Sequence, residues 1–327
     1  MQTERKPVLA LDIGGTKLAV GVLAPDGTLR SFIVEPTHRE QGPAPVLRRL
    51  FGMGHRAVAE AGLDPGGIGA VGISCGGPLD SRSGVLLCPP HLPGWIGVPV
   101  GPLAAAEFHA PAVLANDATA GAWGEYRFGV GRGTHSLVYL TLSTGMGGGA
   151  VLDGRLHRGA AGNGGELGHL MVHPGDRLCT CGRRGCIEAY ASGTAIAERA
   201  AAAVSAGRPS SLASLSTITA RDVAAAGSTD SLAREVWDET TELLGIAVTD
   251  LVNVFEPDLV VFGGGVARAG DLLIDPVARI VASNAMGPAR AAVRIALTAL
   301  GDTVCVVGAG ALALDELQPE PRHPQLA

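Results

Sequence analysis

Short apolar runs that end in glycines are the clearest pattern along this chain. Residues 8–12 form one such run, which ends in Asp12 and is followed by Gly14 and Gly15. Residues 18–23 then read as a returning strand. The two runs together predict a β-hairpin whose bend carries glycines and a threonine.

The pattern of a strand followed by glycines recurs three more times. The later glycine groups begin at Gly145, Gly263 and Gly308, after apolar runs at residues 136–142, 259–262 and 303–307. Two further strands are predicted over residues 68–73 and 111–115, and the second delivers Asn116 and Asp117 at its carboxyl end.

Two longer stretches place apolar residues every three or four positions. This spacing predicts helices over residues 44–62 and 232–255. Helices that alternate with short apolar strands indicate an α/β protein built from layers. The length of 327 residues leaves room for about two domains.

Composition narrows the function classes. A hydrophobic content of 46% with 17% charged residues is that of a globular protein with a full core. The net charge of −6 argues against binding to nucleic acid or an anionic membrane, which needs clustered Lys and Arg. No apolar stretch reaches the 18 or so residues of a membrane span, and residues 1–12 do not resemble a signal peptide. We therefore expect a cytoplasmic enzyme.

A histidine and three cysteines have the spacing of a metal site. Cys179, Cys181 and Cys186 follow His169, and these four ligands are the number that a closed tetrahedral zinc site needs. The alternative is a reduced, glycine-rich loop with chance cysteines. Disulfides are disfavoured because the remaining cysteines are scattered without a framework spacing: Cys75, Cys88 and Cys305.

Glycine-rich bends let backbone N–H groups approach an anion, which favours phosphate binding. One bend alone is a weak signal, but here one carries Asp12 and Lys17 and another follows Thr144. The chain lacks both the P-loop motif and the dinucleotide-binding fingerprint. Because both motifs are absent, we expect the glycine bends of the hairpins to form the phosphate-binding site.

Five motifs in this order resemble those of the ROK family (repressors, open reading frames, kinases), and within it the bacterial ATP-dependent glucokinases and N-acetylhexosamine kinases. They are Asp12-Ile13-Gly14-Gly15-Thr16-Lys17, Asn116-Asp117, Thr144-Gly145-Met146-Gly147-Gly148-Gly149, Gly165-Glu166-Leu167-Gly168-His169 and Cys179-x-Cys181-x4-Cys186-x-Glu188. The resemblance covers roughly residues 8–312. It implies a two-lobed, actin-like (RNase H-like) α/β ATPase fold with a structural zinc site, in which ATP and sugar meet in the interdomain cleft. We expect residues 1–115 and 303–327 to form a small α/β domain and residues 116–302 a large α/β domain that carries the zinc loop.

The resemblance also implies a role for each motif. Asp117 would be the catalytic base, although an acidic residue after a strand can also serve a helix N-cap. Asp12 would hold hydrated Mg²⁺. ATP would be bound by two groups of residues, the first for the phosphates and the second against the adenosine: Gly14, Gly15, Thr16, Lys17, Thr144, Gly145, Gly147 and Gly148, then Gly263, Gly264 and Gly265. The sugar would be bound by Gly77, His91, Asn116, Asp117, Glu166, His169 and Glu188.

The expected reaction is the transfer of a phosphoryl group from ATP to the 6-hydroxyl of a hexose, with glucose preferred. His91 stands where family glucokinases commonly have asparagine, so it either meets the sugar or only packs in a proline-rich loop beside Trp95. The alternatives are an N-acetylmannosamine or N-acetylglucosamine kinase and a non-catalytic, sugar-sensing regulator. Family repressors carry an N-terminal helix-turn-helix, for which the position of Asp12 leaves no room. Polyphosphate is the other possible donor, and we expect a homo-oligomer, either a dimer or a tetramer.

Overall fold

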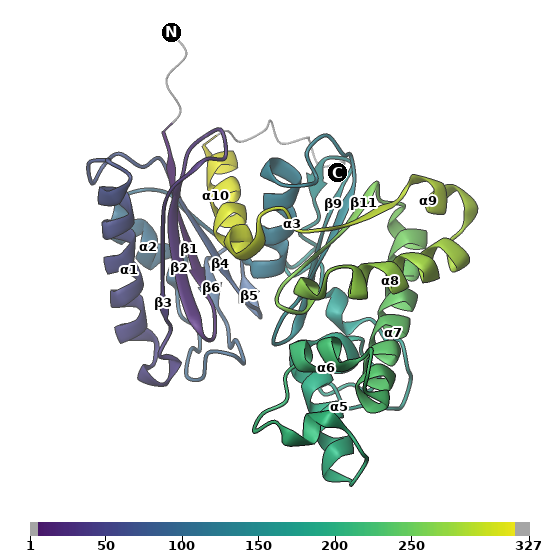
Figure 1. Ribbon diagram of the computed structural model, residues 1–327. Helices are drawn as coiled ribbons and strands as arrows, with labels where there is room; N and C mark the ends of the chain where they lie inside the picture. Colours follow the sequence, from purple (N-terminus) through teal and green to yellow (C-terminus); the bar gives the residue numbers. More distant parts are fainter. Residues whose placement is uncertain (1–5, 318–327) are drawn as a thin grey trace. The chain divides into compact units, whose positions relative to one another are not determined.

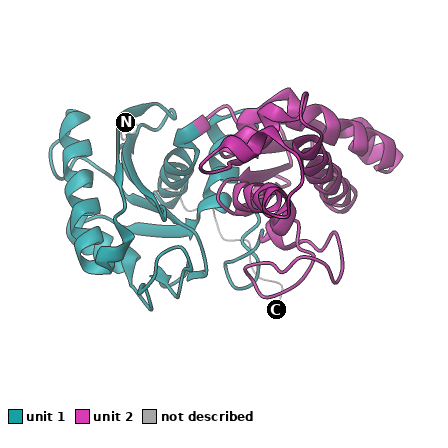
Figure 2. Ribbon diagram, turned by 60° about the horizontal axis from the view of Figure 1, so that its bottom comes forward, with its two compact units in different colours: residues 1–132, 156–165, 302–327 teal, residues 133–155, 166–301 magenta. Residues whose placement is uncertain are grey.

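The computed structural model describes residues 6–317, so the ends of the predicted small domain at residues 1–5 and 318–327 lie outside the described residues. The chain divides into two compact units, shown in different colours in Figure 2. Of the described residues, unit 1 contains residues 6–132, 156–165 and 302–317. Unit 2 contains residues 133–155 and 166–301.

Unit 1 is built on a five-stranded mixed sheet with the order β3-β2-β1-β4-β7. The first three strands form an antiparallel meander, whereas β1, β4 and β7 run parallel. The strands are β1 (Val8–Ile13), β2 (Lys17–Leu23), β3 (Leu29–Pro36), β4 (Val71–Cys75) and β7 (Ala112–Asn116). The predicted hairpin is therefore present as β1 and β2.

Helices cover both faces of this sheet, as Figure 1 shows. Leu9, Leu11 and Ile13 of β1 belong to a core cluster with α1 (Pro43–Glu60) and α2 (Val100–Phe108). Ala10, between them, packs on the opposite face against α10 (Val304–Glu316). Because side chains alternate along a strand, Asp12 points to the face of Ala10.

The predicted strand at residues 303–307 is wrong, because Thr303 ends the 3-10 helix η5 (Gly301–Thr303) and residues 304–307 begin helix α10. This helix packs against α3 (Asp117–Phe128), and a Cβ atom at Gly308 would lie 1.9 Å from the Ala120 carbonyl oxygen. A run of β-branched residues resembles a strand when it is read alone. The small residues of α10 instead allow helix and sheet to approach closely: a Cβ atom at Gly72 of β4 would lie 1.8 Å from the Ala309 carbonyl oxygen.

The observed units differ from the predicted domains in their boundaries, in part because α3 packs against α10. Residues 116–132 lie in unit 1, whereas the predicted boundary assigned them to the large domain. Residues 156–165 also lie in unit 1, where Asn163 exchanges hydrogen bonds with the backbone of Leu79. Small elements complete this unit: β5 (Leu79–Asp80), β6 (Val85–Leu86) and the 3-10 helix η1 (Arg39–Gln41).

Unit 2 holds a second five-stranded mixed sheet with the order β10-β9-β8-β11-β12. β8 and β9 form an antiparallel hairpin, and β8, β11 and β12 run parallel. The strands are β8 (Leu137–Leu142), β9 (Met146–Leu152), β10 (Arg155–Leu156), β11 (Leu259–Gly263) and β12 (Arg294–Leu297).

The core of unit 2 lies between this sheet and its helices. Helix α7 (Ser231–Phe255) runs through that core with many buried residues, and the predicted helix at residues 232–255 is confirmed. The other helices are α4 (Glu188–Ala191), α5 (Gly193–Ser205), α6 (Ala220–Ala226), α8 (Asp271–Asn284), α9 (Gly287–Ala292), η2 (Leu167–His169), η3 (Ser211–Ser214) and η4 (Val266–Ala269), with η5 (Gly301–Thr303) at the return to unit 1.

Among residues 6–317 no helix combines the length and the apolar character needed to cross a membrane.

Candidate functional site

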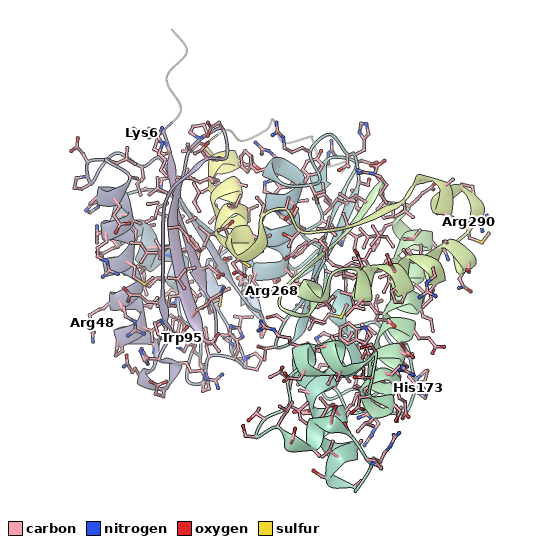
Figure 3. All side chains as sticks on the ribbon, viewed as in Figure 1. Lys6, Arg48, Trp95, His173, Arg268 and Arg290 are labelled. Atoms are coloured by element: carbon pink, nitrogen blue, oxygen red, sulfur yellow. The ribbon has the colours of Figure 1, made fainter. Side chains whose placement is uncertain are left out.

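The carboxyl ends of the parallel strands β1, β4 and β7 bring the first group of predicted site residues together. Asp12 pairs in register with Ser74 of β4, and Cys75 pairs with Asn116 of β7. Asp117 follows Asn116 directly as the first residue of α3. Lys6, which is labelled in Figure 3, lies just before β1 at the opposite end of the sheet. One sheet edge therefore carries both predicted reactive carboxylates.

Asp12 is buried, and its environment disfavours the charged form. The Ser74 hydroxyl donates a hydrogen bond of 2.7 Å to Oδ1 of Asp12. Burial nevertheless raises the pKa of Asp12 to about 7, and the charge of Asp117 adds to the rise, while Ser74 and Lys17 oppose it. A buried carboxylate with so little compensating charge fits a site that binds a cation. Sequence reasoning missed Ser74, although its position directly after the run at residues 68–73 could have suggested it.

The side chains of Asn116 and Asp117 make different hydrogen bonds at the start of α3. Oδ1 of Asn116 accepts hydrogen bonds from the Ala118 and Thr119 amides, so Asn116 is the N-cap of α3. Asp117 accepts one bond of 2.8 Å from the Ala118 amide through Oδ1. Burial raises the pKa of Asp117, against the lowering effects of the Ala118 amide and His91. The capping role considered for Asp117 therefore belongs mainly to its neighbour.

The bend between β1 and β2 is held by a residue that sequence reasoning missed. Thr37 donates a hydrogen bond of 2.7 Å to the Gly14 carbonyl, and its amide donates to the Thr16 carbonyl. A Cβ atom at Gly14 would lie 2.8 Å from the Lys17 carbonyl oxygen, so this tight bend requires glycine there. No local pattern around Thr37 marks it, because the contact depends on the folding of β3.

His91 lies against the same edge of unit 1. Its Nε2 atom is 3.8 Å from the Cys75 sulfur, and a Cβ atom at Gly76 would come within 2.5 Å of the ring. A Cβ atom at Gly15 would contact the His91 backbone and side chain at 3.1–3.5 Å. The imidazole is therefore packed between β4 and the β1–β2 bend. Gly77, also predicted to bind the sugar, lies in the turn from β4 to β5.

The predicted metal ligands come together in unit 2. The ligand atoms of His169, Cys179, Cys181 and Cys186 all lie within 4.8 Å of one another. Nδ1 of His169 is 3.6 Å from the Cys179 sulfur, and the sulfurs of Cys181 and Cys186 are 3.7 Å apart. A tetrahedral zinc with Zn–S bonds of about 2.3 Å would separate two sulfurs by about 3.8 Å and a sulfur from a nitrogen by about 3.6 Å. The cluster therefore fits a zinc ion with four protein ligands.

Two glutamates lie beside this cluster. Oε2 of Glu166 is 3.8 Å from Nε2 of His169, the ring nitrogen that faces away from the cysteines. The two residues share the turn of η2, as their spacing predicted. Glu188 accepts a hydrogen bond of 2.7 Å from the Thr180 hydroxyl through Oε1 and one of 3.0 Å from the Met146 amide through Oε2. Thr180, like Ser74 and Thr37, was not predicted from the sequence, although it lies between the predicted ligands Cys179 and Cys181.

The glycine groups that begin at Gly145 and Gly263 lie at the carboxyl ends of β8 and β11. Residues 143–145 form the bend from β8 to β9, and Gly264 follows β11 with a Cβ direction that points at the Leu142 carbonyl oxygen. Gly147 and Gly148 lie within β9, beyond the bend. A Cβ atom at Gly148 would lie 2.6 Å from the Leu167 side chain, so close packing explains this glycine. Gly265 has open space around it.

The sequence profile of the ROK family matches residues 8–316. The chain belongs to the ROK family. Its fold is the two-lobed, actin-like α/β fold of that family, as the motifs predicted, and its cluster of one histidine and three cysteines is consistent with the zinc site.

Relatives within the ROK family differ in function. The chain is 32% identical over 315 residues to the glucokinase of Thermotoga maritima, covering 95% of this chain and 98% of the relative. It is 33% identical to the N-acetylmannosamine kinase of Escherichia coli, covering 80% of this chain and 84% of the relative. It is also 32% identical to the xylose repressor of Caldicellulosiruptor bescii, covering 85% and 70%. Identity alone therefore does not separate these functions.

Two solved structures of ROK proteins are similar along nearly the whole chain. The ROK hexokinase of Thermus thermophilus has a TM-score of 0.80 and 35% identity, covering 96% of this chain and 100% of that chain. The ROK family glucokinase of Streptomyces griseus, solved in complex with glucose and AMPPNP, has a TM-score of 0.78 and 32% identity, covering 94% and 99%.

Proposed function

We propose that this ROK protein transfers the γ-phosphoryl group of ATP to the 6-hydroxyl of a hexose, with glucose as the preferred sugar. The bond between the γ-phosphorus and the oxygen bridging to the β-phosphorus breaks, and a bond from the sugar oxygen to that phosphorus forms. The products are ADP and the hexose 6-phosphate. The hydroxyl proton passes to a carboxylate of the protein.

The observation that carries this proposal is the pair of carboxylates at one edge of the unit 1 sheet. Asp117 is the candidate base, since it is held at the start of α3 by the Ala118 amide. A carboxylate is a poor base towards an alcohol, but burial raises the pKa of Asp117 and strengthens it in that role. In a loose phosphoryl-transfer transition state the proton leaves late, so the positioning of the hydroxyl by Asp117 matters most.

Asp12 is the candidate ligand of hydrated Mg²⁺, which when bound would neutralise charge on the ATP phosphates. Oδ1 of Asp12 is oriented by Ser74, which fixes the carboxylate towards the face of the sheet that carries α3 and α10. The bend formed by Gly14, Gly15 and Thr16 begins two residues later. Backbone groups of such a bend can approach phosphate oxygens without a side chain intervening.

Unit 2 supplies the groups proposed for the sugar and for the nucleotide. The Glu166 and Glu188 carboxylates are proposed to accept hydrogen bonds from sugar hydroxyls, and the His169 ring is proposed to donate one. The zinc ion would serve as a structural strut, because four protein ligands leave no open position for catalysis. With Nδ1 of His169 directed at the cysteines, Nε2 is the nitrogen left for the sugar. The bend at Thr144 and Gly145 is proposed for the phosphates and the turn at Gly263–Gly265 for the adenosine.

Glucose is favoured over other sugars by the relatives. The glucokinase of T. maritima is matched over almost its whole length, and the similar structure from S. griseus was solved with glucose and an ATP analogue. The second candidate is phosphorylation of N-acetylmannosamine or N-acetylglucosamine. It is supported by the E. coli relative and by His91, which occupies a position where family glucokinases commonly have asparagine.

A coupled assay of purified protein decides between these candidates. Glucose, mannose, N-acetylglucosamine and N-acetylmannosamine would each be tested with ATP and with polyphosphate as donor. We expect the highest kcat/KM for glucose with ATP. A higher kcat/KM for an N-acetylated hexose would replace glucose as the substrate, and the absence of phosphorylation of every sugar would favour a regulator.

A further inference from the structure

Glu188 joins two segments of unit 2 that are far apart in sequence. Its carboxylate oxygens point in different directions, one towards the cysteine loop and the other towards the bend before β9. Oε2 accepts the Met146 amide at 3.0 Å, and a Cβ atom at Gly145 would lie 3.0 Å from the same oxygen. A side chain at residue 145 would therefore crowd the carboxylate away from the bend.

On the other side, Oε1 of Glu188 has two neighbours in the cysteine loop. The Thr180 hydroxyl donates to it at 2.7 Å, and the Cys179 sulfur lies 3.4 Å away. A cysteine that ligates zinc is a thiolate and has no proton to donate. The Thr180 hydroxyl is then the group in this loop that donates a hydrogen bond to Oε1. A hydrogen bond to an ionised carboxylate is stronger than one between two neutral groups.

The segment that begins with Glu188 also supports the rest of the bend. The Gly193 amide donates a hydrogen bond of 2.7 Å to the Ser143 carbonyl, and the Thr194 amide lies 3.4 Å from the Thr144 carbonyl. The bend at residues 143–146 is therefore fixed at both ends by one short stretch, residues 188–194. Of these supports, only the Glu188 carboxylate is in turn fixed by the cysteine loop.

We propose that Thr180 is a positioning residue which, through Glu188, links the metal-binding loop to the bend that binds the triphosphate of the nucleotide. Thr180 touches neither reacting group. It holds the carboxylate that holds the Met146 amide, and so it sets the backbone conformation of residues 143–146. The link itself is a feature of unit 2, whereas its effect on nucleotide affinity depends on the proposed function.

The test compares Thr180→Val, which keeps the shape but loses the hydroxyl, with Thr180→Ser, which restores it. Thr217→Val is the matched control, because Thr217 is an exposed threonine of the same unit outside the cysteine loop. Three quantities are measured in each: zinc per chain, the amide exchange rate of Met146, and the Kd of a non-hydrolysable ATP analogue with Mg²⁺.

We expect Thr180→Val to retain zinc, to exchange the Met146 amide several-fold faster, and to bind the analogue about ten-fold more weakly, as the loss of one hydrogen bond to a carboxylate would produce. Thr180→Ser and Thr217→Val should match the wild type. The proposal would be overturned if the Met146 amide of Thr180→Val exchanged at the wild-type rate. It would also be overturned if Thr180→Val lost its zinc and this loss caused the changes in exchange and binding. If the wild-type protein binds no ATP analogue, the proposed function fails, and exchange at Met146 alone then decides whether the link exists.

Discussion

Nε2 of His91 lies 3.8 Å from the sulfur of Cys75, a residue that is completely buried at the end of β4. The ring therefore packs against the end of β4 in unit 1, whether or not it also contacts a sugar. Burial lowers the pKa of His91 below its ordinary value of 6.5, and Arg39 lowers it further, whereas Asp117 acts in the opposite direction. The folded protein consequently favours the neutral imidazole.

This environment predicts how stability depends on pH. A histidine whose pKa is lower in the folded state binds fewer protons there than in the unfolded state, so stability falls as the pH drops below about 6.5. We expect His91→Asn to remove this contribution, so that its unfolding free energy falls less than that of the wild type between about pH 7.5 and about pH 5. Urea denaturation at both pH values measures the difference.

The exposed His109, which follows α2, provides the control. His109→Asn makes the same change at an exposed position and serves as the reference variant. If His91→Asn shows the pH dependence of the wild type, the half-buried His91 ring does not contribute as expected. The KM for glucose of His91→Asn, measured against pH, separately decides whether the ring meets the sugar or only packs.

Asp117→Asn should lower kcat by at least about 10², because it removes the proposed proton acceptor. The amide oxygen of asparagine can still accept the Ala118 N–H that Oδ1 of Asp117 now accepts at 2.8 Å, so α3 should begin unchanged. The KM for sugar should change much less than kcat. Since burial raises the pKa of Asp117 above its ordinary 3.8, wild-type activity should decline on the acid side at a pH above that value.

Steady-state kinetics with a matched control test this assignment. Asp153 is an exposed acid in the turn after β9, at a positive φ that asparagine tolerates, so Asp153→Asn should keep normal kcat. Near-normal turnover in Asp117→Asn would refute its role as the base.

The purified protein should contain one zinc ion per chain. Structural zinc contributes about 10–16 kcal/mol of apparent binding free energy in small peptides. Cys181→Ser should therefore lose the metal, lower the unfolding temperature and raise the KM for sugar. Cys88→Ser changes an exposed cysteine outside the cluster and should alter none of these. Elemental analysis that finds no stoichiometric zinc in the wild type, or full zinc in Cys181→Ser, would contradict this ligand set.

Helix α10 provides a test of packing in unit 1. In Gly308→Ala the new Cβ atom would lie 1.9 Å from the Ala120 carbonyl oxygen, so α3 and α10 would have to separate. We expect a loss of about 1–3 kcal/mol in unfolding free energy, the range found for overpacked cores. Gly52 of α1 has open space around its Cβ direction, and Gly52→Ala should instead stabilise by about 0.4–1 kcal/mol. Equal stability of the two variants would contradict the close helix contact.

Several features of this protein could be predicted from sequence because they depend on neighbours along the chain. The β1–β2 hairpin follows from two apolar runs around glycines, and helices α1 and α7 follow from their apolar periodicity. The metal cluster follows from ligand types and short spacings, since a loop of this length can bring its own cysteines together. The adjacency of Glu166 and His169 follows from one turn of helix.

Other features were decided only by tertiary structure, because they depend on what lies opposite a segment. Residues 304–307, predicted as part of a strand, instead begin helix α10, since the small residues of this helix pack against α3 and β4. The same contact assigns residues 117–128 to unit 1. Three hydroxyls near the site could be identified only from the fold. Folding places Ser74 within hydrogen-bonding distance of Asp12, Thr37 of the β1–β2 bend, and Thr180 of Glu188. A hydroxyl does not show its partner in the sequence, because strand register and loop packing select that partner, here 8 to 62 residues away.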